Sequence, residues 1–265
     1  LPAAWCGIVG FKPSHGRVPV DPFYLGRCAG PMTRTVEDAA LAMAVLARAD
    51  PRDATALPPE AIDWTALGTD LAGRTVGLML EPGCGMAVDP QILSATEAAA
   101  RHLERRGARI RLAPPLMDRA ILDGIDDFWR CRSWGDLRAL PEAARSRVLP
   151  YILAWASAAE TISGVRAVTG FNRTYEIRRR AAALFGEIDL LVSPVTPVLS
   201  FPAEAASPLD DPQRPFEHIV FTLPWNMGEQ PAVALNAGLA RCGAPIGVQI
   251  VGPRLADLAT LAAAR

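Results

Sequence analysis

Few residues of this sequence have the types and spacing that catalysis usually requires. The chain contains no HExxH zinc motif, no glycine-rich phosphate loop and no GxSxG nucleophile motif. Ser14 and His15 are adjacent, but the side chains of neighbouring residues rarely point at one another as a nucleophile and its base must. Lys12 is the only lysine of the chain, so any catalytic lysine taken from this sequence would have to be Lys12. Local motifs alone therefore assign no catalytic residue.

The carboxylates and cysteines of the chain do not identify a catalytic or metal-binding site either. Asp126, Asp127 and Asp189 are candidates for a general acid or base, yet isolated carboxylates among many arginines more often form ion pairs or helix caps. Residues 83–85 read Gly-Cys-Gly, an incomplete dinucleotide pattern for which a turn is the alternative. The five cysteines never form a CxxC pair, which favours reduced thiols over disulfides or a zinc site. We therefore expect no metal and no cofactor.

The pattern of apolar residues predicts the helices and strands that would position a functional site. Thr35 with Asp38 predicts a helix cap, and Asp89 with Pro90 predicts another. Helices are expected at residues 36–48 and 90–107, strands at 75–80, 108–112 and 189–194, and a hairpin from 232–235 and 246–251. Residues 116–185 read as a helical layer, and residues 194–215 as a long loop with six prolines. The predicted fold class is α/β with a mixed β-sheet core flanked by helices, in a single domain over residues 1–265.

Composition excludes several classes of function. Half of the 265 residues are hydrophobic and 21% are charged, which is typical of a globular chain with a large core. The formal net charge of -1 offers no field for a polyanion or an anionic membrane, so we expect no nucleic-acid or membrane partner. No apolar run is long enough to cross a bilayer, and residues 1–10 lack the basic flank of a signal peptide. The expected location is cytoplasmic.

Several blocks of the sequence resemble one enzyme family. Residues 2–18 resemble the tail of the amidase signature, and residues 30–40 and 50–53 resemble the helix that follows it in the family and the exit of that helix. Residues 189–197 resemble the later strand and proline loop of the family, and residues 245–252 its terminal strand. Since the blocks occur in family order over nearly the whole chain, the sequence is identified as a member of the amidase-signature enzymes.

The resemblance implies a Ser-Ser-Lys hydrolase of carboxylic amides. A serine attacks the amide, a second serine relays the proton, a lysine is the final base, and backbone amides form the oxyanion hole. Acylation releases an amine or ammonia, and water then frees the acid, without a cofactor. In the family all three catalytic residues precede the proline that corresponds to Pro2, so the domain is expected to be incomplete at its N-terminus. Lys12 matches a structural Lys-Pro pair of the family, and we assign no catalytic residue to this sequence.

The remaining expectations concern the substrate and its pocket. Phe128 and Trp129 could line an acyl pocket or pack in the core. Trp225, Asn226 and Gln230 match a family segment near the active site, with packing as the alternative. We therefore expect these five residues to contact a small-molecule amide.

The choice of substrate is open on the sequence alone. The A subunits of glutamyl-tRNA amidotransferases carry an aspartate just before the Phe-Thr pair that matches residues 221–222, where this chain has Ile219 and Val220. A general aliphatic or aryl amidase is therefore favoured, and the transamidase component is the alternative. An inactive homologue that serves as a binding module is a third possibility. Relatives of this kind also suggest a possible homodimer.

Overall fold

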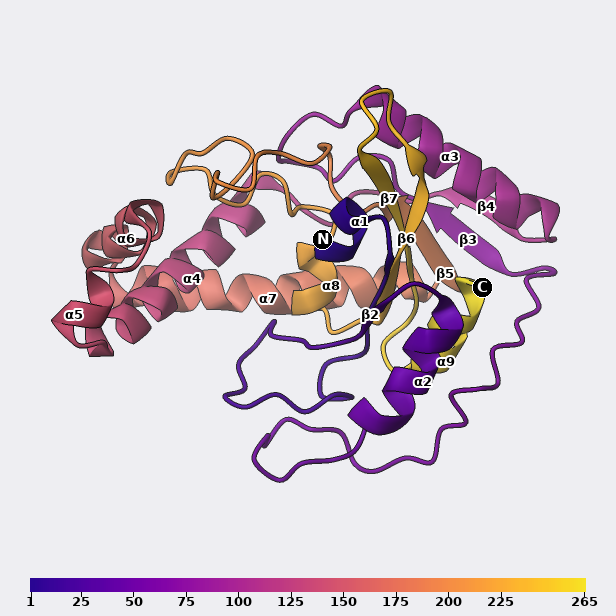
Figure 1. The fold of residues 1–265 in the computed structure, drawn as a ribbon, viewed down its shortest axis with the longest axis horizontal. Helices are drawn as coiled ribbons and strands as arrows, with labels where there is room; N and C mark the ends of the chain where they lie inside the picture. Colours follow the sequence, from indigo (N-terminus) through magenta and orange to yellow (C-terminus); the bar gives the residue numbers. More distant parts are fainter.

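The computed structural model describes residues 1–265 and contains one seven-stranded sheet (Figure 1). The strands are β1 (Val9–Lys12), β2 (Met32–Thr33), β3 (Thr75–Leu78), β4 (Arg109–Leu112), β5 (Leu190–Pro194), β6 (Ala232–Leu239) and β7 (Pro245–Val251). Their order is β2-β1-β6-β7-β5-β3-β4. β3 pairs in parallel with β4 and β5, and the other pairs are antiparallel. The mixed sheet and its α/β class agree with the sequence-based prediction.

The helices lie on both sides of this sheet and in an arm that extends away from it (Figure 1). They are α1 (Pro2–Cys6), α2 (Val36–Leu46), α3 (Pro90–Arg105), α4 (Arg119–Ala139), α5 (Glu142–Arg145), α6 (Pro150–Ser157), α7 (Gly164–Phe185), α8 (Leu223–Met227) and α9 (Asp257–Ala263), with a 3-10 turn η1 at Ala158–Thr161. None of them is both long and apolar enough to cross a membrane.

Local chemistry explains where the predicted helices begin. The Thr35 hydroxyl accepts a hydrogen bond from the Asp38 amide at the start of α2, and Asp89 accepts one from the Gln91 amide at the start of α3. Four short elements were missed: α1 and β1 in the Gly- and Pro-rich opening of the chain, β2 directly after it, and α8. Each of the four is five residues or shorter, so none contains enough residues to produce a periodic pattern.

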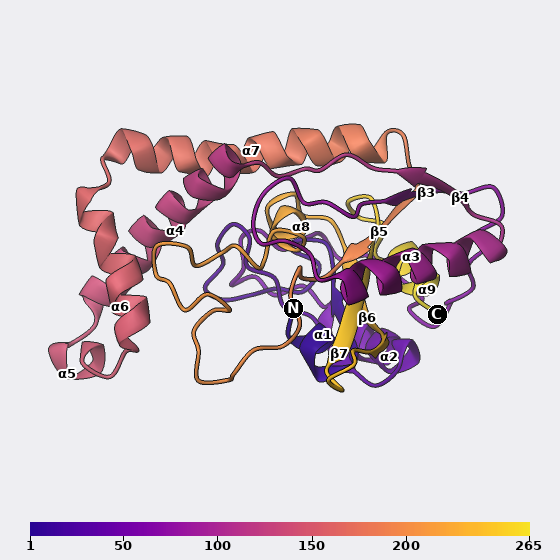
Figure 2. The same ribbon diagram turned by 90° about the horizontal axis from the view of Figure 1, so that it is seen from above.

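Two apolar layers sandwich the centre of the sheet. Neighbouring residues of a strand point to opposite faces, so Val192 and Ile250 pack with Leu103 of α3, whereas Leu191 and Val251 pack with residues of α7 and α8. Figure 2 shows α7 on the opposite side of the sheet from α3. The site described below lies on the α8 side.

α1 lies directly on the sheet because two strand positions have no side chain. A Cβ atom on Gly10 of β1 would overlap the side chain of Ala3, and one on Gly247 of β7 would overlap that of Ala4. Ala3 and Ala4 are both buried in this contact. The two glycines therefore fix the height of the first helix above the sheet.

The region after β1 is joined to the C-terminal helix by a buried carboxylate. Asp257, whose side chain is 0% exposed, accepts hydrogen bonds from the Ser14 amide (2.6 Å) and from Arg17 Nε (3.2 Å). The Ser14 hydroxyl in turn accepts a bond from the Leu255 amide at 2.9 Å. Ser14 is thus occupied in a structural contact with the α9 region.

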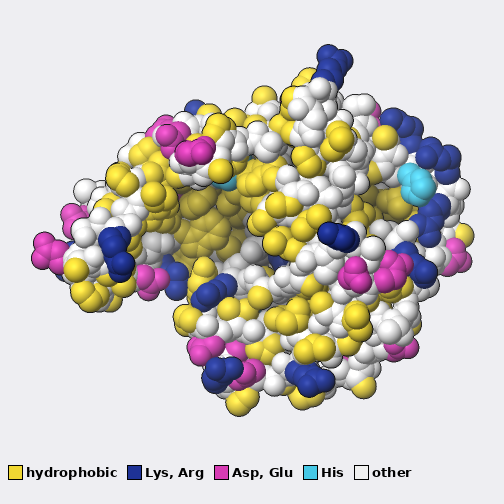
Figure 3. All heavy atoms as spheres, viewed as in Figure 1, with side chains coloured by type: hydrophobic (Ala, Val, Ile, Leu, Met, Phe, Trp, Pro, Cys, Tyr) yellow, Lys and Arg dark blue, Asp and Glu magenta, His cyan; other side chains and the backbone are white.

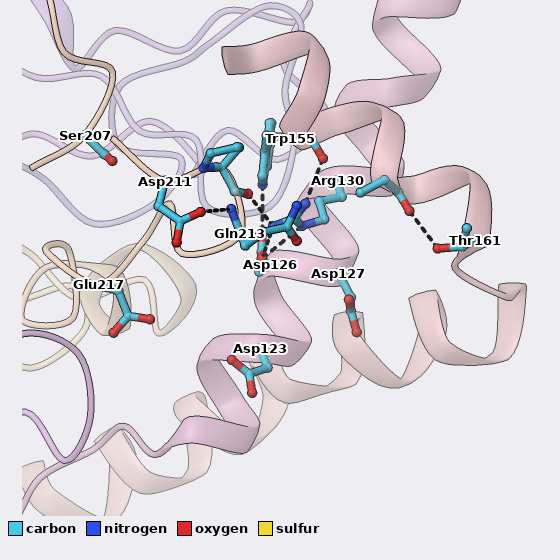
Figure 4. A network of polar contacts seen from close by, with 12 residues as sticks. Asp123, Asp126, Asp127, Arg130, Trp155, Thr161, Ser207, Asp211, Gln213 and Glu217 are labelled. Atoms are coloured by element: carbon cyan, nitrogen blue, oxygen red, sulfur yellow. Dashed lines mark hydrogen bonds and ion pairs between the residues drawn. The ribbon is translucent and has the colours of Figure 1, made fainter. Parts of the chain in front are cut away.

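The long proline loop is attached to the helical arm by a second polar network (Figure 4). Arg130 of α4 donates to Asp126 (2.9 Å), to the Trp155 carbonyl (2.9 Å) and to the Pro212 carbonyl (2.8 Å). Trp155 Nε1 donates to the other oxygen of Asp126 at 2.7 Å. Burial raises the pKa of Asp126 in spite of these two donors. Arg130 therefore links α4, α6 and the loop through one buried guanidinium.

We expect the Asp257→Ala variant to lose about 3–5 kcal/mol of unfolding free energy, because it leaves the Ser14 amide and the buried Arg17 without their partner. Arg17 would retain only Glu60, which is 59% exposed. Chemical denaturation monitored by circular dichroism measures the change. Asp50→Ala, which removes an exposed ion pair with Arg52, is the control and should barely shift the midpoint. Equal shifts for the two variants would contradict this account of Asp257.

We expect the Arg130→Met variant to release the proline loop while the sheet stays folded, because three bonds to one buried charged group are lost. Amide exchange in residues 207–217 should accelerate at least about tenfold, whereas exchange in β5 and β7 should stay unchanged. Hydrogen-exchange mass spectrometry provides the measurement. Arg138→Met on the exposed side of the same helix is the matched control. Unchanged exchange in the loop of the Arg130 variant would show that the network does not hold it.

Candidate active site

A cavity of about 280 Å³ lies between α1, the end of β1, α8 and the middle of the sheet. Residues from distant parts of the chain form its walls: Pro2 and Ala3 of α1, Lys12 of β1, Thr222, Trp225 and Asn226 at α8, and Gln249 of β7. Figure 3 shows that the face turned to the viewer is also hollowed between the helical arm and the rest of the molecule, with hydrophobic side chains on the floor. The cavity places the first residues of the chain beside the segment around α8.

The Gln249 side chain connects two segments of the cavity wall by hydrogen bonds. Its side chain is 2% exposed, and its amide nitrogen lies within hydrogen-bond distance of Ser193 Oγ (2.9 Å), the Pro194 carbonyl (3.1 Å) and the Phe221 carbonyl (2.7 Å). These acceptors belong to the end of β5 and to the segment that leads into α8. Sequence analysis missed this role, although a lone amide in the apolar strand at residues 245–251 was a signal that it needs buried partners.

Trp225 and Asn226, two of the residues expected to contact the substrate, lie in the cavity wall. Trp225 is 1% exposed, and its indole N–H has no hydrogen-bond acceptor in the protein. Asn226 Nδ2 donates to the carbonyl of Gly26 at 2.7 Å, which ties α8 to the loop after β1. The structure thus brings these two residues together with Lys12 and Gln249.

The other three expected residues lie elsewhere. Phe128 packs edge-on against Phe171 with ring centroids 5.2 Å apart, within the contact between α4 and α7. Trp129 packs edge-on against Phe216 at 4.9 Å, and a side chain on Gly26 would touch it. Gln230 lines a separate surface pocket beside Arg178 and Arg254. None of the three lines the cavity described above.

The turn that follows α8 is held by charge. Glu229 has a φ of 73°, a left-handed conformation that is uncommon for a residue with a side chain. Its carboxylate accepts bonds from Arg178 (2.6 Å) and Arg254 (2.8 Å), and Arg178 also donates to the Met227 carbonyl (3.0 Å). The two arginines therefore stabilise the left-handed conformation of Glu229, two residues after the end of α8.

A thiol and an imidazole lie near one end of the cavity. Cys28 lines it, with its Sγ atom 3.8 Å from His15 Nδ1. Burial raises the pKa of Cys28, so the thiol is protonated at neutral pH and is a weak nucleophile. His15 therefore neighbours a thiol, whereas the Ser14 hydroxyl is bonded to the Leu255 amide.

The remaining motifs have structural roles. Asp127 pairs with Arg166, and Asp189 pairs with Arg74 while accepting a bond from the Thr75 amide, which lowers the pKa of Asp189. Gly83 and Gly85 both have positive φ angles, as expected for a turn. No group of three or more His, Cys, Asp or Glu side chains is arranged to hold a metal ion.

Comparison with known proteins places this architecture in one family. The model of the Amidase family matches residues 1–126 and 138–261. The chain is 31% identical over 283 residues to the A subunit of the glutamyl-tRNA(Gln) amidotransferase of Synechococcus sp. (strain WH7803), covering 95% of the chain and 57% of that protein. It is 30% identical to the protein of the same name from Thermosynechococcus vestitus, with 95% of the chain and 58% of that protein covered. The chain thus spans little more than half the length of these curated relatives.

Solved structures are similar over nearly the whole chain. A bacterial aryl acylamidase described as one of the amidase-signature enzymes superposes with a TM-score of 0.85 and 28% identity, covering 98% of this chain and 58% of the other. The 6-aminohexanoate cyclic dimer hydrolase superposes with a TM-score of 0.83 at 22% identity, which shows a shared fold, and covers 99% of this chain and 61% of the other. The resemblance found in the sequence is confirmed: the chain belongs to the Amidase family.

Proposed function

We propose that this chain forms the substrate-binding part of an enzyme that hydrolyses a carboxylic amide C–N bond to an acid and an amine or ammonia. The observation that carries the proposal is the match to the Amidase family on both sides of the cavity, from α1 through to β7. The structural similarity to an aryl acylamidase supports the same reaction class.

The serine nucleophile, the bridging serine and the lysine base are proposed to precede Leu1. Leu1, Pro2 and Ala3 line the cavity, so a residue just upstream of α1 would stand at its mouth. That position agrees with the family resemblance, in which the nucleophile comes a few residues before Pro2. On this proposal the 265 residues alone hydrolyse no amide.

The cavity favours a small amide as substrate. We propose that Trp225 and Asn226 contact it, because both line the cavity next to α1. Trp129 is proposed as an outer wall, since it lies near Gly26, to which Asn226 is bonded. Phe128 and Gln230 lie outside the cavity, and we propose no substrate contact for them there.

The second candidate is the A subunit of a glutamyl-tRNA(Gln) amidotransferase, which would release ammonia from glutamine together with partner subunits. The names of the curated relatives favour it, with 31% identity to the Synechococcus protein. Ile219 and Val220 count against it, because they replace the region in which those proteins carry an aspartate. Relative activity on glutamine and on an apolar amide such as phenylacetamide distinguishes the two candidates.

We expect the protein purified from its source to have an intact mass well above 28.3 kDa and to react at a single serine with a fluorophosphonate probe. The 265-residue polypeptide should not react, because the Ser14 hydroxyl accepts from the Leu255 amide and makes no hydrogen bond to His15 or Lys12 that would activate it. Mass spectrometry measures both the mass and the labelled site. Stoichiometric labelling of the 265-residue polypeptide would place the nucleophile within it and contradict the assignment.

In a protein that contains the upstream segment, we expect Asn226→Ala to raise KM for the amide substrate about 2- to 10-fold and to change kcat less. The substitution removes the hydrogen bond from Asn226 to Gly26, so α8 and the loop after β1 separate at the cavity wall. Steady-state kinetics provides the measurement. Asn172→Ala, on the exposed side of α7, is the matched control. An Asn226 variant with unchanged KM would remove this residue from the proposed binding wall.

A further inference from the structure

A second pocket, of about 620 Å³, lies at the C-terminal end of α7 beside the turn that follows α8. Its walls come from α7 and the glycine after it, from residues 228–230 and from residues 253–254. It shares no lining residue with the cavity beside α1. The proposed hydrolysis therefore leaves this pocket without a role.

The charged side chains of the pocket have an excess of positive charge. Two arginines and one glutamate line it, which gives a net charge of +1, and Arg178 and Arg254 share the carboxylate of Glu229 at 2.6 and 2.8 Å. A guanidinium has five N–H donors. Arg254 contacts Glu229 through Nε alone, and Arg178 uses Nε and one terminal nitrogen in its hydrogen bonds. The terminal nitrogens that remain are available to another acceptor.

The two guanidiniums are oriented by the protein. Arg178 donates to the Met227 carbonyl at 3.0 Å and lies over the ring of Tyr175, 5.6 Å from its centroid. The side chains of Arg178 and Arg254 are 31% and 47% exposed, so a solute can reach both. A guanidinium that is already fixed loses little freedom when it binds an oxyanion. The pair therefore forms a preorganised anion site.

A buried amide of the same pocket lacks a partner. Gln230 is 4% exposed and lines the pocket, and its Oε1 atom accepts no hydrogen bond in the protein. Gly228 makes room for it, because a Cβ atom at that position would lie 2.2 Å from Oε1. Buried polar atoms are nearly always paired. The pocket therefore favours a ligand that also donates an O–H or N–H.

One small oxyanion supplies both kinds of group. Each form of inorganic phosphate near neutral pH carries negative oxygens and at least one P–O–H group, whereas sulfate has the same tetrahedral shape and no proton. We propose that the pocket between α7 and the turn after α8 binds a phosphate ion. Its charged oxygens accept from Arg178 and Arg254, and its hydroxyl donates to Gln230 Oε1.

This inference goes beyond the proposed function, because no step of amide hydrolysis uses the pocket. Arg178 also holds the Met227 carbonyl at the end of α8, so a phosphate bound to Arg178 contacts the group that fixes this end of the helix. Binding is measured without an amide substrate. Failure of the phosphate site and failure of the proposed hydrolysis are therefore separate results.

The test is calorimetric titration of the full-length protein, with any residues that precede Leu1, at pH 7. Sodium phosphate and sodium sulfate are compared at the same ionic strength. We expect a Kd for phosphate of about 1 mM or lower, because two oriented arginines donate charge-assisted hydrogen bonds. Sulfate should bind at least about fivefold more weakly, since it leaves Gln230 Oε1 without a donor. Phosphate should also raise the melting temperature more than sulfate does.

Variants assign the binding to particular side chains. Arg254→Met removes a guanidinium and should weaken phosphate at least about tenfold. Arg179→Met removes an exposed arginine of α7 that does not line the pocket, so it is the matched control and should leave the affinity unchanged. Gln230→Met keeps the size of the side chain, removes the acceptor, and should abolish the preference for phosphate over sulfate. Circular dichroism establishes that each variant is folded.

Three results would overturn the proposal. They are absence of phosphate binding to the folded wild type, equal affinity of the wild type for phosphate and sulfate, and unchanged phosphate affinity in Arg254→Met. The last result would assign the phosphate to another cation. The first two results need only the wild type, so the proposal remains testable if a variant fails to fold.

Discussion

The buried side chain of Gln249 is the interaction on which the geometry of the cavity depends. Its amide nitrogen reaches acceptors at the end of β5 and in the segment before α8. An amide this deeply buried must be paired, because an unpaired one carries the full cost of desolvation. A shift of the α8 segment would remove the Phe221 carbonyl, which makes the shortest of the three contacts, and is therefore disfavoured. Trp225 and Asn226 lie in α8 directly after that segment, so their place in the wall follows from a hydrogen bond in the centre of the sheet.

Outside the centre of the sheet, charged side chains connect the irregular loops to the helices. Arg130 attaches the proline loop, Asp257 attaches the segment after β1 to α9, and Arg178 with Arg254 holds the turn at Glu229. Each contact joins residues far apart in the chain, and one member of each is largely buried, where the loss of its partner is costly. The chain has 24 prolines and 21 glycines, so long irregular connections are unavoidable. These charged hydrogen bonds and ion pairs fix such connections in one arrangement.

The sequence predicted the elements whose patterns are local. Thr35 and Asp89 mark helix starts because capping is a contact between near neighbours, and the strands around Val76 and Val192 are apolar runs between turn residues. It could not predict contacts that depend on the tertiary fold. Gln249 and Asp257 carry no local mark of their partners, which lie 28 and 243 residues away. A family motif placed Trp225 near a site. That its indole N–H has no hydrogen-bond acceptor in the protein depends on tertiary contacts, so only the structure could show it.

The chemistry available at the cavity separates binding from bond cleavage. The Cys28 thiol is protonated, the Thr222 hydroxyl donates to the Ile219 carbonyl at 3.1 Å, and Ser14 is committed to the Leu255 amide. Of these three groups only Cys28 has a neighbouring base, because its Sγ atom lies 3.8 Å from His15 Nδ1. The chain spans 57% of the length of the Synechococcus relative, and its first three residues line the cavity together with α8.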